Sequence, residues 1–87
     1  RLYKFNIMKK QLEKIKLIWD FRGPVAEKTA QHHLKHLHEF FKIEKKTLIS
    51  FGTESLSDLH TFAYVVVNKA ELDFYKSKLK PHRGQLA

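Results

Sequence analysis

Histidine residues gather in one stretch of the sequence, between Pro24 and Phe41. Four of the six histidines lie there, and an imidazole accepts or donates a proton near neutral pH. At helical periodicity, His33 falls inside an apolar stripe and His36 falls at the margin of that stripe. We therefore predict that His33 and His36 are the candidate catalytic residues, acting as general base or general acid.

The same histidines raise the question of a metal site. His32 and His36 are four residues apart, a spacing that places two imidazoles on one face of a helix. The sequence contains no Cys and no H-E-x-x-H motif. The stronger interpretation is a set of surface histidines, with His33 partly buried and hydrogen-bonded to the backbone. We predict no metal and no cofactor.

A second group of polar residues surrounds the end of the first predicted strand. Asp20 and Arg22 stand directly before a predicted helix, and the free N–H groups at a helix N-terminus can hold a carboxylate or a phosphate. Gly23 allows such a ligand to approach closely. The alternative is that Asp20 and Arg22 form only a surface ion pair. The candidate ligand-binding residues are Asp20, Arg22, Gly23, His60, His82 and Arg83, the last two on a C-terminal tail that is able to fold over a cleft.

The hydrophobic pattern predicts strands and helices in a definite order. Alternating apolar residues favour strands, and a stripe at helical spacing favours a helix. Asn68 and Glu71 form a capping-box-like pair at the start of a second helix, and Pro81 ends that helix. The predicted elements are a strand at 13–21, a helix at 24–41, a strand at 47–51, a turn from Gly52 to Asp58, a strand at 59–67 and a helix at 68–80, with a further short strand at 2–7.

This order, β-α-β-β-α, is the start of a split β-α-β arrangement. We therefore predict an α+β fold, a ferredoxin-like sandwich with an antiparallel sheet and two helices on one face. The domain is expected to span residues 13–80. Residues 1–12 are interpreted as a basic N-terminal extension, either an extra strand or a segment foreign to the natural chain. Residues 81–87 are interpreted as a C-terminal tail, either a loose end or a short edge strand.

The third predicted strand, Leu59–Val67, is apolar on both faces. A strand with one face in water alternates apolar and polar residues, so this pattern indicates that both faces are covered. Two helices cover one face. A second copy of the chain is the expected cover for the other, because 87 residues bury too little surface to be very stable alone. We predict a homodimer.

The sequence resembles the dimeric α+β barrel superfamily, and within it the YCII-like group, in three places. These are His36-Leu37-x-x-Phe40 in the first helix, Ile49-Ser50-Phe51-Gly52 after it, and the apolar third strand followed by the acidic start of the second helix. The resemblance implies a homodimer with a cleft between sheet and helices and a His-based active site, in which only His36 carries over by position. Gly52 is followed by Thr53, where that group typically has Gly-Pro, and the acidic partner of the histidine has no match here.

The net charge of +8 suggests acidic partners, but its distribution weakens that argument. Residues 1–16 contain six Lys or Arg against one Glu, so most of the excess lies in the N-terminal segment rather than on the fold. No apolar run approaches about 20 residues, the length of a membrane span, so no membrane partner is predicted. The absence of Cys favours a reducing compartment, and a cytoplasmic location is the expectation.

Three functions are consistent with these observations. The main prediction is a homodimeric protein that binds a small anionic ligand in a cleft lined by His, Arg and Asp. One alternative is a nucleic-acid-binding module that uses the basic N-terminus and the cluster at Lys76–Arg83. The other is a non-catalytic structural or interaction dimer. The sequence contains no nucleophile elbow and no phosphate-binding glycine loop, so whether the protein is an enzyme stays open.

Overall fold

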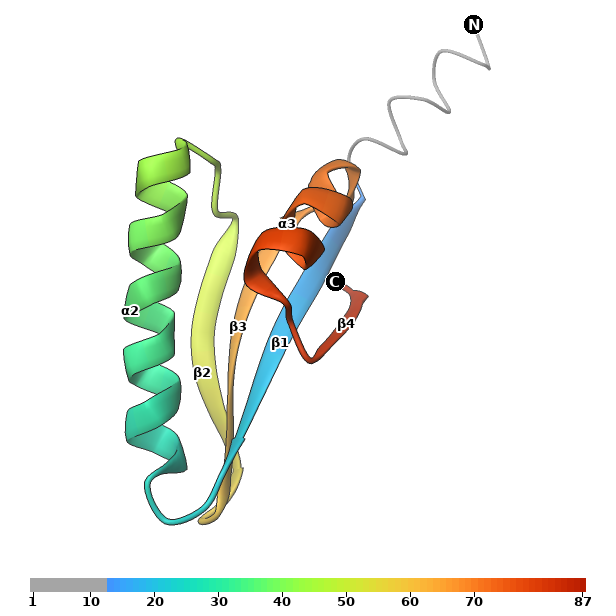
Figure 1. Cartoon of the computed structure of the whole chain (residues 1–87). Coiled ribbons are helices and arrows are strands. Elements are labelled where there is room, and N and C mark those ends of the chain that lie inside the picture. Colours follow the sequence, from blue (N-terminus) through green and yellow to red (C-terminus); the bar gives the residue numbers. More distant parts are fainter. Residues whose placement is uncertain (1–12) are drawn as a thin grey trace, which may run out of the picture.

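The computed structural model describes residues 13–87 (Figure 1). It is an α+β fold with four antiparallel strands and two helices in the order β-α-β-β-α-β, which confirms the predicted ferredoxin-like class. The elements are β1 (Lys14–Arg22), α2 (Ala26–Glu44), β2 (Ser50–Ser57), β3 (His60–Asn68), a 3-10 turn (Lys69–Glu71), α3 (Leu72–Leu79) and β4 (Arg83–Leu86).

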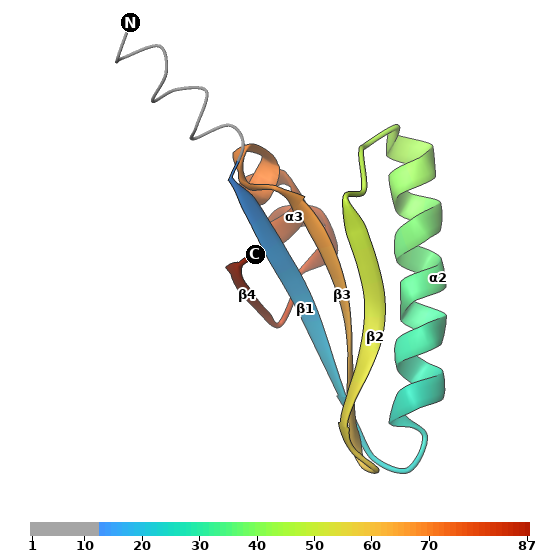
Figure 2. The ribbon, with the colours of Figure 1, turned by 180° about the vertical axis from the view of Figure 1, so that it is seen from behind.

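The four strands form one sheet in the order β2-β3-β1-β4, with every neighbouring pair antiparallel. Strands β1 and β3 pair along their whole length, from Lys14 opposite Asn68 to Arg22 opposite His60. Figures 1 and 2 show α2 and α3 on one side of this sheet. We call that side the helix-covered face. The open face, on which neither helix packs, presents Lys16, Ile18, Asp20 and Arg22 of β1, His60, Phe62, Tyr64 and Val66 of β3, Gly52 and Glu54 of β2, and Arg83 and Gln85 of β4.

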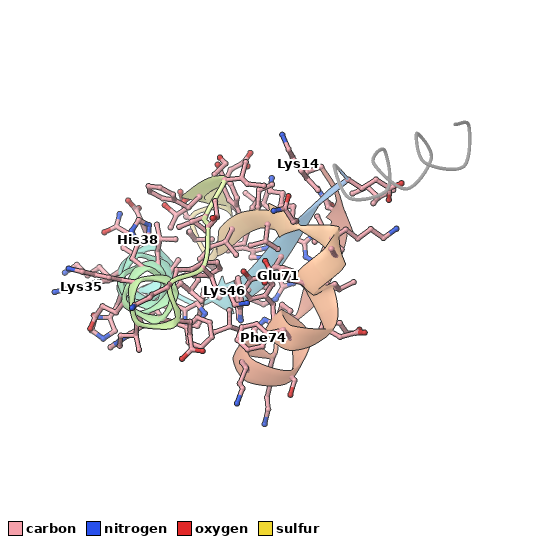
Figure 3. All side chains as sticks on the ribbon, turned by 90° about the horizontal axis from the view of Figure 1, so that it is seen from above. Lys14, Lys35, His38, Lys46, Glu71 and Phe74 are labelled. Atoms are coloured by element: carbon pink, nitrogen blue, oxygen red, sulfur yellow. The ribbon has the colours of Figure 1, made fainter. Side chains whose placement is uncertain are left out.

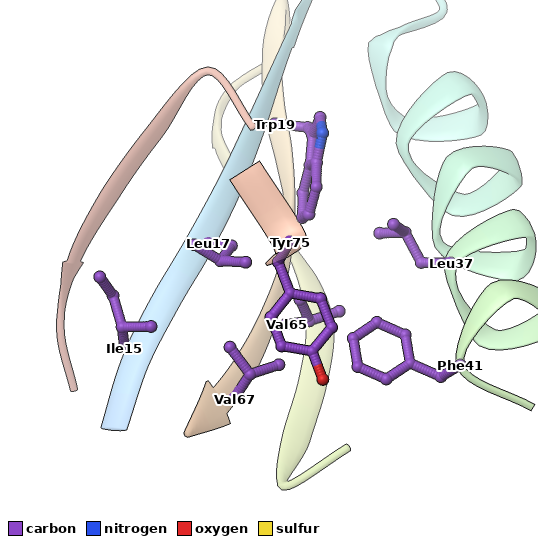
Figure 4. Close-up of a cluster of buried hydrophobic side chains, with 8 residues drawn as sticks. All are labelled: Ile15, Leu17, Trp19, Leu37, Phe41, Val65, Val67 and Tyr75. Atoms are coloured by element: carbon purple, nitrogen blue, oxygen red, sulfur yellow. The ribbon is translucent and has the colours of Figure 1, made fainter. Parts of the chain in front are cut away.

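The hydrophobic core lies between the helices and the sheet (Figure 4). Leu37 and Phe41 of α2 and Tyr75 of α3 meet the apolar side chains of β1 and β3 there. The rings of Phe41 and Tyr75 stack with their centroids 5.2 Å apart. The indole Nε1 of Trp19 donates a hydrogen bond to the carbonyl of Leu79 at 3.1 Å, which fixes the last turn of α3 to β1.

Helix α2 begins and ends later than the predicted range of 24–41. Gly23, with a φ of 111°, turns the chain out of β1, and the helix then starts at Ala26. It continues through Glu44 to a left-handed residue, Lys45, and the N–H of Lys46 donates back to a carbonyl in the last turn. The buried residues Ala26, Ala30, Leu37 and Phe41 recur at helical spacing, as the stripe predicted.

The prediction for β2 was wrong in its bounds. The strand spans Ser50–Ser57, so most of the predicted turn is strand, and the chain reverses only at Asp58 and Leu59. A polar strand is acceptable here because β2 lies at the edge of the sheet, where side chains and one row of backbone groups meet water. The hydroxyl groups of Ser55 and Thr61, 2.9 Å apart, add a cross-strand hydrogen bond to β3.

The second helix also starts differently from the prediction. Lys69–Glu71 form a 3-10 turn before α3, and Asn68 makes no capping hydrogen bond with its side chain. Glu71 instead pairs with Lys46, whose Nζ lies 2.6 Å from its carboxylate oxygen and 4.7 Å from the centroid of the Phe74 ring. Figure 3 shows these three side chains between the end of α2 and the start of α3. The contact ties the two helices together over the core.

The predicted C-terminal tail is partly a strand. Arg83–Leu86 pair with β1 as β4, the second of the two possibilities considered for that segment. The predicted strand at 2–7 lies outside the described residues.

Among residues 13–87, neither helix combines the length and the apolar character needed to cross a membrane.

Candidate functional site

Asp20 is the centre of a hydrogen-bonded group on the open face. It lies on β1, between β3 and β4, and the side chains of both neighbouring strands reach it diagonally. His60 Nε2 lies 2.8 Å from Oδ1 of Asp20. Arg83 donates from Nε to Oδ2 at 2.8 Å and from Nη2 to Oδ1 at 3.0 Å, a two-pronged ion pair. The group therefore joins the three strands β3, β1 and β4.

The charges in this group are fixed by the ion pair. The hydrogen bonds from Arg83 lower the pKa of Asp20 far below its ordinary range, more than partial desolvation raises it, and His60 lowers it further. The same contact raises the pKa of Arg83. Asp20 is therefore ionised at any physiological pH and can only accept hydrogen bonds.

The ionised carboxylate decides how His60 is protonated. Because Asp20 only accepts, the Nε2 of His60 carries the hydrogen, and in a neutral imidazole Nδ1 is then an acceptor. Arg22 Nη1 lies 3.4 Å from this Nδ1 and is its donor. Among the residues that the structure describes, Arg22 forms no ion pair with a carboxylate. The result is an oriented histidine beside a guanidinium that is available to a ligand.

His82 supports the site through the backbone. Its Nδ1 accepts a hydrogen bond from the N–H of Asp20 at 2.9 Å, and its own N–H donates to the carbonyl of Ile18 at 2.9 Å. These two bonds hold the start of β4 against β1 and so place Arg83 beside Asp20. His82 is in the predicted group, but its ring nitrogen is already engaged.

His33 lies on the other side of the sheet. Its ring packs against Trp19 and Phe21, with centroids 5.1 and 5.4 Å away, and its Nε2 is buried with no hydrogen-bond partner among the described residues. Desolvation lowers the pKa of His33, and the nearby His36 and His82 lower it further. His33 is therefore a half-buried histidine at the core edge, away from the carboxylate of Asp20.

His36 and Gly23 also lie apart from this group. His36 is exposed on α2 and contacts His32 and Glu39. The N–H of Gly23 donates to the carbonyl of Leu59 at 2.8 Å, so it closes the turn instead of facing a ligand. A hollow of about 330 Å³ near the start of α2 is bordered by Glu27 and Asp58, and two carboxylates disfavour an anion there.

The sequence prediction missed the part that Lys16 plays. Its Nζ lies 4.3 Å from the ring centroid of Tyr64 and 5.4 Å from that of Phe62, and Arg83 lies 5.4 Å from the Phe62 ring as well. These cations cover the aromatic rings, which leaves Phe62 only 6% exposed although neither α2 nor α3 packs over it. The alternation of Lys16, Ile18 and Asp20 along β1 placed Lys16 on this face and was the signal that could have identified it.

Of the eight predicted site residues, five meet in one place: Asp20, Arg22, His60, His82 and Arg83. Within residues 13–87, no group of three His, Asp or Glu side chains is placed to hold a metal ion. The arrangement is suited to holding an anion beside an oriented imidazole. No family model matches the chain, and comparisons with curated proteins and with solved structures give no match either.

Proposed function

We propose that the open face of the sheet binds a small carboxylate or phosphate and that His60 exchanges a proton with it. The observation that carries this proposal is the chain of contacts from Arg83 to Asp20, to His60 and on to Arg22. It fixes the imidazole with one nitrogen on a carboxylate and the other beside a guanidinium. An anion that pairs with Arg22 lies next to the acceptor nitrogen of His60.

The local charge favours an anion. Lys16, Arg22 and Arg83 supply three cations to this part of the open face, and Asp20 neutralises one of them. The net charge of these four side chains is therefore positive, whether or not His60 is protonated. Protonation of His60 strengthens anion binding, and release of that proton to a bound anion completes the exchange. Only N–H and O–H bonds form and break in this step.

A second copy of the chain is part of the proposal. Ile18, Phe62 and Val66 form an apolar floor on the open face, already less than 10% exposed in the single chain, with Lys16 and Arg83 lying over the Phe62 ring. A partner sheet would have to displace these two cations to pack on that floor, and it would then enclose the polar group and exclude water. The resemblance to the dimeric α+β barrel superfamily and the YCII-like group supports such a dimer. In this chain, however, the histidine of the proposed site comes from β3 and not from the helix position of His36.

The direct test is an NMR titration of the full chain with inorganic phosphate and, separately, with acetate. Shifts are expected at Arg22, His60 and Arg83. Arg22→Met should weaken binding by about tenfold or more, because one charge-assisted hydrogen bond is lost. Lys28→Met, which removes an exposed cation from α2, is the matched control and should bind as the wild type does. No shift at millimolar ligand, or equal binding by Arg22→Met, contradicts the proposal.

Proton exchange needs its own measurement. Calorimetric titrations with acetate, a carboxylate that stays ionised near neutral pH, in two buffers of different ionisation enthalpy give the number of protons taken up on binding. We expect a net proton uptake in the wild type that is absent in His60→Gln. Equal uptake in both proteins would show that another group exchanges the proton.

The dimer is tested separately by light scattering at micromolar protein concentration. A dimeric mass is expected, and Val66→Glu, which places a charge on the apolar floor, should shift the mass toward the monomer. A monomeric wild type would contradict the proposed dimer. The NMR titration with phosphate would still test the anion site independently.

The cations over the aromatic rings favour one further candidate function, the binding of single-stranded nucleic acid. Aromatic rings on a four-stranded sheet are a known platform for unpaired bases, and here the bases would take the places of Lys16 and Arg83 over the rings of Tyr64 and Phe62. Gel-shift titrations with single-stranded RNA over a salt series separate it from small-anion binding. Phosphate-backbone contacts give affinity that falls steeply with salt, and Lys16→Gln should make that slope shallower.

A further inference from the structure

We propose that His32 and His36 form a surface site for a divalent transition-metal ion. Both are exposed residues on α2, one helical turn apart, and their Nε2 atoms lie 3.0 Å apart with ring centroids at 4.6 Å. The two nitrogens therefore already converge on one point in space. This site is independent of the open face and of the anion proposed to bind there.

The separation of the nitrogens suits chelation. With metal–nitrogen distances of about 2.0–2.1 Å, two imidazoles bound to one ion bring their nitrogens to roughly 3–3.5 Å of each other. The backbone of α2 sets the spacing, because residues four apart face the same side of a helix. Zinc-binding helices use this same spacing for two of their ligands. Little rearrangement is needed here, since the rings already contact each other through these nitrogens.

The contact between the two histidines needs one donor and one acceptor. Either histidine can be the donor, so one Nε2 carries the hydrogen and the other a lone pair. On metal binding, the donor ring moves its hydrogen to Nδ1 and both Nε2 atoms become ligands. The carboxylate of Glu39, with Oε1 3.9 Å from Nδ1 of His36, is too distant for a hydrogen bond but places a negative charge beside the pair that favours a cation.

The chemistry of the ligands defines the class of ion. Neutral imidazole nitrogens suit Cu²⁺, Ni²⁺ and Zn²⁺, and the general order of stability places Cu²⁺ first. Two protein ligands leave the remaining coordination positions to water, because the side chain of His36 is 61% exposed. The site is thus an open, two-ligand chelate on the surface of α2. Hard ions such as Mg²⁺ and Ca²⁺ prefer oxygen ligands and are excluded.

The test is a titration of the full chain, without a polyhistidine tag, with ZnCl₂ and with CuCl₂ in separate experiments. Binding is followed by calorimetry and by the imidazole ¹⁵N signals. We expect one ion per chain, tighter binding of Cu²⁺ than of Zn²⁺, and Zn²⁺-induced shifts in the imidazole ¹⁵N signals of His32 and His36 and not in those of the other histidines. MgCl₂ should give no binding.

Variants of exposed residues make the test specific. His32→Gln and His36→Gln should each lower the affinity for Zn²⁺ by more than about tenfold, because a chelate is reduced to a single ligand. Lys35→Gln, between them on the same helix, is the matched control and should bind as the wild type does. Glu39→Gln should weaken binding several-fold without abolishing it. No binding at millimolar Zn²⁺ or Cu²⁺, or binding unchanged in His32→Gln, overturns the proposal.

Discussion

The two faces of the sheet are buried by different means. Leu17 and Ile18 are neighbours on β1, each 1% exposed, and they point to opposite faces. Leu17 is covered by the two helices, whereas no described helix packs over Ile18. On the open face, the long side chains of Lys16 and Arg83 lie across the apolar surface. A small sheet can therefore shield one face with a second layer and the other with its own cations.

The faces also differ in how their polar atoms are satisfied. On the helix side, three buried polar atoms find no hydrogen-bond partner in the part of the chain that the structure describes: His33 Nε2, His38 Nε2 and the hydroxyl oxygen of Tyr75. On the open face, Asp20 accepts three hydrogen bonds from two side chains. Packing dominates one face, and a fixed polar network dominates the other. This difference is the reason for placing the proposed function on the open face.

Leu17→Ala and Ile18→Ala give the largest expected effects and compare the faces directly. Leu17→Ala should lower the free energy of unfolding by about 3–4 kcal/mol, because a rigid second layer cannot close the cavity. Ile18→Ala should cost only about 1–2 kcal/mol in the monomer, because flexible cations can collapse onto the gap. Denaturant unfolding measures both. If both substitutions lowered the free energy of unfolding equally at low protein concentration, the two faces would not differ in how rigidly they are covered.

Asp20→Asn should remove the polar network and lower the free energy of unfolding by about 1–2 kcal/mol at neutral pH. Because folding lowers the pKa of Asp20, its contribution is present above the ordinary carboxyl value of 3.8 and is lost as pH falls below it. The wild type and the variant should therefore converge in stability on the acid side. Glu54→Gln, an exposed residue on the same face, is the control and should change stability by less than about 0.5 kcal/mol.

Tyr75→Phe tests the unsatisfied polar atoms of the helix side. Burial is the main cause that raises the pKa of Tyr75 to about 12, and its hydroxyl group has no partner within residues 13–87. Removing the hydroxyl group should leave stability unchanged or raise it by up to about 1 kcal/mol. Thermal unfolding followed by circular dichroism measures the change. A clear loss of stability would mean that the hydroxyl group is hydrogen-bonded in solution.

His33→Leu should have the smallest effect, seen only in the pH dependence. Folding lowers the pKa of His33 through burial, so its unfolded form takes up a proton first as pH falls through the ordinary value of 6.5. Stability is therefore lost on the acid side of that value in the wild type and retained in the variant. The measurement is the slope of unfolding free energy against pH. Gln31→Leu, an exposed site on the same helix, should keep the wild-type slope.

The sequence allowed the fold class to be predicted because its signals are periodic. The apolar stripe from Ala26 to Phe41 and the alternation along β1 and β3 each depend on local spacing. The bounds of β2 were not predictable in this way. Gly52, Thr53 and Ser55 have the composition of a turn, but pairing with β3 makes them a strand, and tertiary contacts override local preference at a sheet edge.

The site was partly predictable for a related reason. Asp20 and Arg22 could be placed on one face by alternation, and the crossover rule brought His60 beside them. Arg83 was only a candidate because nothing local shows that a four-residue segment after Pro81 returns to pair with β1. His33 and His36 share a helix, so their spacing suggested a joint role. The sheet lies between His33 and Asp20, because the two residues are on opposite faces of it. The spacing of residues along one helix cannot predict this separation.

The position of Trp19 gives the protein an optical reporter. It is the only tryptophan in the sequence, it is 3% exposed, and its ring lies 5.1 Å from that of His33. An indole in a dry core emits at shorter wavelength than one in water, and a charged imidazole at contact distance quenches that emission. The emission wavelength of Trp19 should therefore report unfolding of the core, and its emission intensity should report protonation of His33. Neither measurement needs a label.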